Sequence, residues 1–483
     1  MSSVKRPITT IAAAAFVLAA CARDAEPERP RHLILVTVDT LRADHLSAWG
    51  YPRATSDAAG AEKRGTPAGF ALDELAAQGT RFAHAFTPRG ETFPALCTLF
   101  TGKPPPETGV LGNRETLAAS HTTLAERLRA AGFRTAAFTT NKLLVPGSGI
   151  EQGFEVLETD FGEERDAVVL EGASRWIAAQ PADARCFVWV HLMGPHLPYA
   201  PRPSHGVDFA SAFADAAYAG PANGSREFID AAYTEQRALP AADRARIGDL
   251  YDGEIARVDQ LVGRFARGLG ARLDESLLVF TADHGEELGE RSGYFGHSKS
   301  VSSAVLHVPL FFRWPNGGRP GGIPAGARRD EVVQHEDLLA TLLALFGLPP
   351  EKEARGLALD RLLRGGPDPR FDGRVAIGLW RFDVFTAADA ARRVVWNPEK
   401  REPQELPRGP YPVPELALYD RAKDPAELVD RAPEDRAEAE RYVARIRSWS
   451  RRLVVSSAAQ GALSPERRRA LIDQGYVGDD DDH

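Results

Sequence analysis

Two short apolar runs, each ending in an acidic residue, constrain the fold of this chain most. Residues 33–39 read LILVTVD and end in Asp39, and residues 277–284 read LLVFTADH and end in Asp283 and His284. Such continuous aliphatic runs are typical of parallel strands that are buried on both faces. In open α/β sheets, sites form just beyond the carboxyl ends of the strands. Two carboxylates and an imidazole at such an edge predict a site for a divalent metal ion.

Helical segments alternate with further apolar runs along the chain. Amphipathic helices are predicted at residues 70–79, 122–132 and 241–269, and strands at 186–192 and 308–314. Alternating strands and helices form a parallel sheet with both faces covered. We therefore expect an α/β fold with a large, mostly parallel sheet covered by helices on both faces, and a small C-terminal α+β subdomain.

Connecting segments predict the domain boundaries. A tether is expected at 22–31, a catalytic domain at 32–365, a C-terminal subdomain at 370–455 and a polar tail at 456–483. The Gly- and Pro-rich stretch 364–374 is the predicted linker. The net charge of −8 and the lack of a long basic run argue against nucleic acid as a partner.

Residues 91–102, ETFPALCTLFTG, predict a loop followed by a short helix. Pro94 suits the first helical turn and Gly102 suits the C-terminal cap. Thr92 would lie at the helix start, where free N–H groups form a seat for a phosphate or sulfate group. Its hydroxyl either caps the helix or attacks such a group.

Four motifs, in this order, resemble the sulfatase-like branch of the alkaline phosphatase superfamily. They are VTVDTLRADHLSAWGYPR from residue 36, the segment 91–102, LMGPHLPYAP from residue 192, and TADHGEELGE from residue 281 followed by FGH. The resemblance spans residues 31 to about 450. It implies that Thr92, ten positions before Gly102, is the nucleophile. It further implies that Asp39, Asp283 and His284 hold the metal beside the Thr92 hydroxyl, and that His196 and His297 line the anion pocket.

The nucleophile segment departs from the sulfatase pattern. Sulfatases proper carry Cys or Ser in a C-x-P-x-R pattern, and that residue is converted to formylglycine. Here Thr92 takes the first position and Leu96 takes the place of the arginine. Cys97 lies five positions late and is expected to be a small apolar helix residue. Thr nucleophiles occur in the phosphodiesterase, pyrophosphatase and phosphotransferase branches, so the resemblance favours phosphodiester and phosphonate substrates over sulfate esters.

Other polar residues complete the predicted site. Either His297 or His196 is expected to assist the leaving group, whereas His191 lies within a strand and is expected to be a core residue. Lys299 and Arg42 are predicted anion contacts.

One divalent metal ion is expected. Thr40 stands where many sulfatases have a second Asp, which lowers the negative charge of the site and makes calcium less favoured than manganese or zinc; all three remain open. A second metal would need a further Asp/His cluster, but Ala256 follows Asp252 at the position where a histidine would be required.

The first 21 residues predict a lipoprotein signal peptide. A basic start at Lys5 and Arg6 precedes an apolar core that is too short to span a bilayer. Residues 18–21, LAAC, resemble a lipobox, which implies cleavage before Cys21 and lipid attachment to it. Ala22 in place of Asp favours the outer membrane, facing the periplasm of a bacterial envelope. The alternative is an ordinary secreted protein with an incidental cysteine.

These features predict a metal-dependent hydrolase of phosphate- or sulfate-type esters, acting on a small-molecule, glycan or lipid ester. Three alternatives remain open. They are a transferase that hands a phospho group to an envelope glycan or lipid, a sulfatase that works without formylglycine, and a degenerate protein that binds but does not catalyse.

Overall fold

The computed structural model describes residues 29–162, 164–235, 238–291, 293–318, 322–380, 383–400, 413–456 and 464–473. The predicted signal peptide, its Cys21 and the acidic end at 478–483 lie outside the described residues. None of the described helices is both long and apolar enough to cross a membrane.

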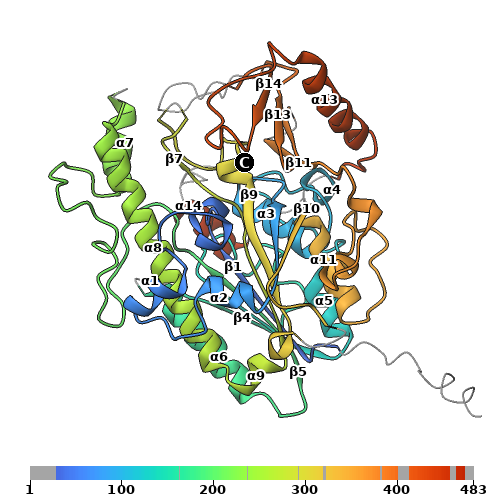
Figure 1. Cartoon of the computed structure of the whole chain (residues 1–483). Coiled ribbons are helices and arrows are strands. Elements are labelled where there is room, and N and C mark those ends of the chain that lie inside the picture. The colour runs from blue at the N-terminus through green and yellow to red at the C-terminus, as the bar shows by residue number, and fades with distance from the viewer. Residues whose placement is uncertain are drawn as a thin grey trace, which may run out of the picture.

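An eight-stranded sheet forms the centre of the molecule (Figure 1). Its strands are β1 (His32–Val38), β2 (Gly79–Phe86), β3 (Phe133–Thr139), β4 (Val156–Thr159), β5 (Arg185–Leu192), β6 (Ser276–Ala282), β9 (His307–Arg313) and β10 (Ala327–Gln334). The spatial order is β10-β2-β9-β6-β1-β5-β3-β4. Only β9 runs antiparallel to its neighbours β2 and β6, whereas the other pairs are parallel. The predicted large, mostly parallel sheet is confirmed.

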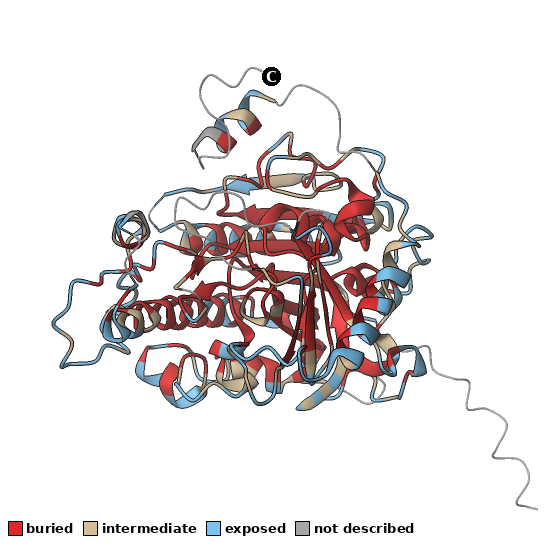
Figure 2. Ribbon diagram, turned by 90° about the horizontal axis from the view of Figure 1, so that it is seen from above, coloured by how far each residue is buried: buried red, intermediate tan, exposed pale blue. Residues whose placement is uncertain are grey.

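Helices cover the sheet on both faces (Figure 1). On one face α1 (Ala58–Lys63), α2 (Leu72–Ala77) and α6 (Arg165–Ala179) contact the long helix α8 (Ala241–Gly268). On the other face α3 (Thr92–Thr101) contacts α5 (Leu124–Ala130) and α11 (Glu336–Leu345). Figure 2 shows that the strands are buried and that the exposed residues lie mainly on the outer helices and loops. Helix α8 buries the predicted apolar stripe, including Ile247, Ile255 and Val262.

Short elements connect these layers. They are α4 (Pro105–Thr108), α7 (Arg226–Thr234), α9 (Ala271–Asp274), β7 (Glu287–Leu288), β8 (Phe295–Gly296), α10 (Ser303–Leu306) and α12 (Asp360–Leu363).

The C-terminal subdomain is a second, antiparallel sheet with one helix. Its strands β11 (Ala376–Trp380), β12 (Val384–Ala388), β13 (Arg392–Trp396) and β14 (Leu416–Asp420) pair in chain order, and α13 (Arg436–Ser450) packs on them. The Gln334 amide accepts a hydrogen bond from the Ile377 N–H at 3.1 Å and donates one to the Ile377 carbonyl at 2.9 Å, which ties β11 to β10. A small C-terminal α+β unit follows the large sheet, as expected.

Part of the predicted polar tail is a helix, α14 (Pro465–Asp473). Its Arg467 side chain is fully buried, with the guanidinium 4.6 Å from the centre of the Phe93 ring. The same guanidinium donates to the carbonyls of Asn113 at 2.9 Å and Glu115 at 3.1 Å. Arg467 and Leu471 of this helix are both fully buried, and the Arg467 guanidinium lies beside the first turn of α3.

Candidate active site

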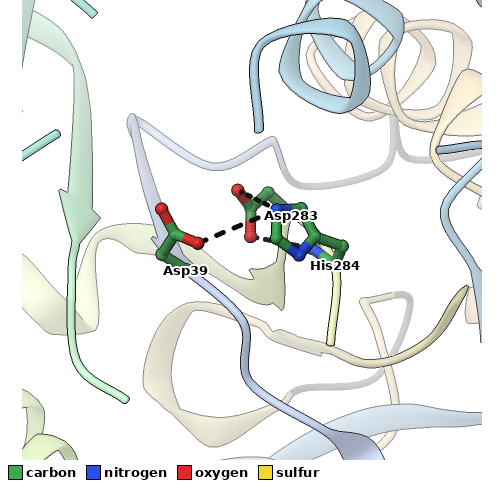
Figure 3. A group of neighbouring side chains, drawn as sticks. All are labelled: Asp39, Asp283 and His284. Carbon is green, nitrogen blue, oxygen red and sulfur yellow. Dashed lines mark hydrogen bonds and ion pairs between the residues drawn. The ribbon is translucent and has the colours of Figure 1, made fainter. Parts of the chain in front are cut away.

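The two acidic strand ends meet at one edge of the sheet. Asp39 directly follows β1 and Asp283 directly follows β6, and the last residues of these neighbouring strands are paired. Figure 3 shows the side chains of Asp39, Asp283 and His284 facing one another. One potential ligand atom from each of them lies within 4.8 Å of the others, and all three residues are fully buried. The predicted cluster of metal ligands is therefore assembled.

The free atoms of this cluster fit a divalent cation. Within the described part of the chain, Asp39 Oδ1 and Asp283 Oδ2 have no hydrogen-bond partner. His284 Nε2 lies 3.8 Å from Asp39 Oδ1 and 3.5 Å from Asp283 Oδ2. His284 Nδ1 lies 3.0 Å from the Gly285 carbonyl, which only accepts, so the proton sits on Nδ1 and the Nε2 lone pair faces the carboxylates.

Burial shifts the pKa values of the three residues in the cluster. Burial, and then the nearby Asp39 carboxylate, raises the pKa of Asp283 well above its usual value. Burial also opposes ionisation of Asp39, but the nearby imidazoles of His191, His196 and His284 outweigh this effect and lower the pKa of Asp39. Burial, and then the charge of His297, lowers the pKa of His284 to about 3, so this imidazole is a neutral ligand. A bound cation would let both carboxylates ionise.

Thr92 lies at this cluster, as predicted from the sequence. Its Oγ is 3.4 Å from Asp39 Oδ2 and 3.4 Å from His284 Nε2, and the residue is 2% exposed. Helix α3 begins at Thr92 itself, and the N-cap position belongs to Glu91. The N–H of the next residue, Phe93, is already bonded to the side-chain oxygen of Asn113 at 2.9 Å. The side chain of Thr92 therefore faces the metal ligands rather than capping the helix.

Cys97 is separate from this chemistry. It is fully buried inside α3, and burial raises the pKa of its thiol far above the usual value. It is a small core residue, as expected.

The two predicted anion-pocket histidines lie next to the cluster. The ring centre of His297 is 4.4 Å from that of His284 and 5.3 Å from that of His196. His297 Nδ1 is 2.8 Å from Glu286 Oε1, and burial raises the pKa of Glu286 to about 7 while it lowers the pKa of His297. This pair can hold one shared proton near neutral pH.

The structure gives Arg42 partners within the protein. Its guanidinium donates to both oxygens of Asp44, at 2.9 and 2.8 Å, and also bonds Glu290. These bonds do not support the predicted anion contact by Arg42, because its charge is already paired. Lys299, half-buried two residues after His297, stays a prediction.

Three residues around Asp39 and His297 were not predicted as parts of the site. Asn141 Nδ2 donates to Asp39 Oδ2 at 2.8 Å, and His191 Nε2 lies 3.6 Å from the same oxygen. Glu286 is the third. Asn141 comes two residues after β3, so its place past a strand end was a usable signal. His191 is fully buried, as expected, but its side chain also borders the carboxylate.

Asp252 is not part of the metal cluster. It accepts hydrogen bonds from His45 Nδ1 at 2.8 Å, the Tyr51 hydroxyl at 2.7 Å and Arg53 at 2.8 Å. Among the described residues, the group with metal-ligand geometry is the one formed by Asp39, Asp283 and His284. The expectation of one metal ion stays a prediction.

Comparison with known proteins places these features in a family. The sulfatase family matches residues 31–348. Human arylsulfatase A is 27% identical over 449 residues, covering 83% of this chain and 83% of the relative. An N-acetylglucosamine-6-O-sulfatase from Bacteroides thetaiotaomicron is 22% identical, covering 86% of this chain and 85% of the relative.

Solved structures share the fold. A phosphonate monoester hydrolase from Agrobacterium radiobacter superposes with a TM-score of 0.67 at 22% identity, covering 88% of this chain and 96% of that chain. A structure solved with its substrate D-glucosamine-2-N,6-O-disulfate gives a TM-score of 0.68 at 16% identity, with 88% and 98% coverage. The family match spans well over half of the chain and includes the metal cluster and Thr92. The chain therefore belongs to the sulfatase family and is an ester hydrolase.

Proposed function

We propose that this protein hydrolyses phosphonate and phosphate diesters in preference to sulfate esters, with Thr92 as the nucleophile and one divalent metal ion. The observation that carries the proposal is the position of the Thr92 hydroxyl, 3.4 Å from both Asp39 and His284. A hydroxyl at that place is next to the cation that the cluster fits, and it needs no conversion to formylglycine.

Asp39, Asp283 and His284 would hold the cation. When bound, the cation would lower the pKa of the Thr92 hydroxyl and polarise the ester. Thr92 Oγ attacks the phosphorus, and the bond to the leaving alcohol breaks as the new O–P bond forms. Asp39 Oδ2 is the nearby oxygen that can take the hydroxyl proton.

His297 supplies the proton that the leaving oxygen needs. Glu286 fixes its ring through Nδ1, which leaves Nε2 for the substrate. Water then attacks the phosphorus and gives a proton to His297 Nε2, the bond between Thr92 Oγ and phosphorus breaks, and Thr92 Oγ takes back its proton from Asp39.

The preference for phosphorus rests on two further observations. The residue at the nucleophile position is threonine, and Leu96 stands in place of the arginine that accompanies formylglycine. A phosphonate monoester hydrolase is also among the proteins with this fold.

A substrate panel tests the proposal. The metal-loaded protein is assayed with 4-nitrophenyl phenylphosphonate, bis(4-nitrophenyl) phosphate, 4-nitrophenyl phosphate and 4-nitrophenyl sulfate. We expect kcat/KM for the first two to exceed that for the sulfate by about tenfold or more, an energy difference of ~1.4 kcal/mol in the transition state. The highest kcat/KM on the sulfate ester would instead identify a sulfatase that works without formylglycine.

A further inference from the structure

A cavity of about 350 Å³ lies beside the catalytic centre, and no step of the reaction above uses it. Its walls are the first turn of α6, the loop after β5 and the middle of α8. His196 lines the cavity, and its ring centre lies 5.3 Å from that of His297. A substrate whose reacting group sits at Thr92 and His297 can therefore extend into the cavity past His196.

Three arginines line this cavity. They are Arg165 at the start of α6, Arg202 in the loop after β5, and Arg257 on α8. Arg257 is fixed in place, because its side chain is only 6% exposed and its guanidinium donates to Glu164 Oε2 at 2.7 Å. Its buried Nε has no hydrogen-bond partner within the described residues. An oxyanion in the cavity could satisfy that donor.

Two carboxyl groups also line the cavity and offset part of this charge; Asp166 Oδ2 lies 3.8 Å from Arg257 Nη1. Asp166 accepts the backbone N–H groups of Met193 at 2.9 Å and Gly194 at 3.2 Å, so its charge stabilises the loop that carries His196. Glu254 is buried, and burial raises its pKa to about 7, so it carries only part of a negative charge at neutral pH. The lining thus holds three guanidinium groups against the Asp166 carboxylate and a partly protonated Glu254, so its net charge is positive.

The cavity also offers an apolar surface. Phe161 lines it and is 38% exposed, one of few large apolar side chains exposed in the described chain. An aromatic ring beside guanidinium groups suits a ligand with a flat or apolar body and an acidic substituent.

We propose that this cavity binds the organic part of the substrate and selects esters whose organic part carries its own negative charge. This inference rests on the proposed function, because it takes the reacting group to lie at Thr92. The substrate class is then an ester whose alcohol part carries a separate acidic group. That group is a carboxylate, sulfate or phosphate, and it lies near the ester bond that is cleaved.

Two matched esters test the selection. They are 3-carboxy-4-nitrophenyl phenylphosphonate and its neutral 3-carbamoyl analogue, which have nearly the same size. We expect kcat/KM to be about tenfold higher for the carboxylate, in line with charge-assisted hydrogen bonds to arginine. In the Arg165→Gln/Arg202→Gln variant the ratio should fall to near one, while the rate on the carbamoyl ester changes by less than about twofold.

The control variant Arg175→Gln/Arg264→Gln removes two exposed arginines from the same helices, α6 and α8, and should keep the preference. Equal rates on the two esters in the wild type, or a preference that survives in the Arg165→Gln/Arg202→Gln variant, would overturn the proposal.

A binding measurement separates this proposal from the proposed function. Calorimetry of the two released phenols on the metal-loaded wild type should show about tenfold tighter binding of 3-carboxy-4-nitrophenol, which Arg165→Gln/Arg202→Gln removes. If neither ester is hydrolysed but this difference is present, the proposed function fails and the cavity assignment stands. If the phenols bind equally, the cavity assignment fails whatever the rates are.

Discussion

The reactive side chains of this site are almost fully removed from water, and this sets their chemistry. The side chains of Asp39, Asp283 and His284 face one another, and 0% of the surface of each residue is accessible to solvent. In such surroundings a pair of carboxylates holds two charges only beside a cation. The same burial lets Glu286 share a proton with His297, because it brings the pKa of Glu286 to about 7. Burial thus prepares the site for both a metal ion and a proton donor.

Removal of one carboxylate tests the metal assignment. We expect Asp283→Asn to reduce bound divalent metal from about one ion per chain to nearly none, and to abolish turnover, because a charged ligand is lost. Elemental analysis of the purified protein and circular dichroism measure metal content and folding.

Asp259→Asn is the matched control. Asp259 is a buried carboxyl on α8 that accepts a hydrogen bond from the N–H of Leu72 at 2.7 Å, away from the cluster. This variant should keep its metal. Undiminished metal in Asp283→Asn would show that the ligands lie elsewhere.

Elements with a strong local pattern were predictable from the sequence, and elements fixed by distant contacts were not. The strands that became β1 and β6, and the helix α8, follow from apolar runs and helical spacing. Helix α14 buries Arg467 and Leu471, and its place depends on the bonds from Arg467 to carbonyls far away in the sequence. Glu286 and the arginine-lined cavity likewise depend on which strands and helices become neighbours. The edge of the sheet that carries Asp39, Asp283 and His284 was predictable, because the carboxyl ends of parallel strands share one edge. Their close approach depends in addition on β1 and β6 being neighbours.

The helix α14 should stabilise the start of α3. Arg467→Ala would leave the carbonyls of Asn113 and Glu115 without this donor, so we expect the free energy of unfolding to fall by about 1–3 kcal/mol. Because Phe93 follows Thr92 directly, kcat should fall as well. Denaturant unfolding and steady-state kinetics measure the two effects.

Arg469→Ala, which changes an exposed arginine of the same helix, should leave both quantities nearly unchanged. Equal stability of the Arg467 variant and the wild type would mean that α14 does not hold α3 in solution.

At the scale of the whole molecule, only a short segment of chain separates the catalytic domain from the proposed lipid anchor. We propose that the mature chain begins at a lipidated Cys21 on the outer membrane and faces the periplasm. Strand β1 starts at His32, so the connecting segment spans at most about 40 Å when fully extended. The site would then work near a membrane surface, within reach of envelope glycans and lipids as well as of small esters.

Cys21→Ser tests the anchor. Without the thiol no lipid is attached, so the protein should leave the membrane fraction or keep its uncleaved signal peptide. Fractionation and intact-mass measurement separate these results, and Ala22→Ser, which retains the cysteine, should remain at the membrane. A mature-length Cys21→Ser chain that still fractionates with membranes would contradict the anchor.

The central claim is that the Thr92 hydroxyl forms the covalent intermediate. We expect Thr92→Ala to lower kcat by about a thousandfold or more while the protein stays folded and metal-loaded, and Thr92→Ser to keep much of the activity. Thr98→Ala is the control, since Thr98 lies in the same helix and its buried hydroxyl has no hydrogen-bond partner in the described chain.

The most direct measurement is mass spectrometry of the enzyme quenched with acid during turnover. The account predicts a phospho or phosphono adduct on Thr92 in the wild type, no adduct in Thr92→Ala, and an unmodified Cys97 without formylglycine. A wild-type rate for Thr92→Ala, or a formylglycine at Cys97, would contradict it.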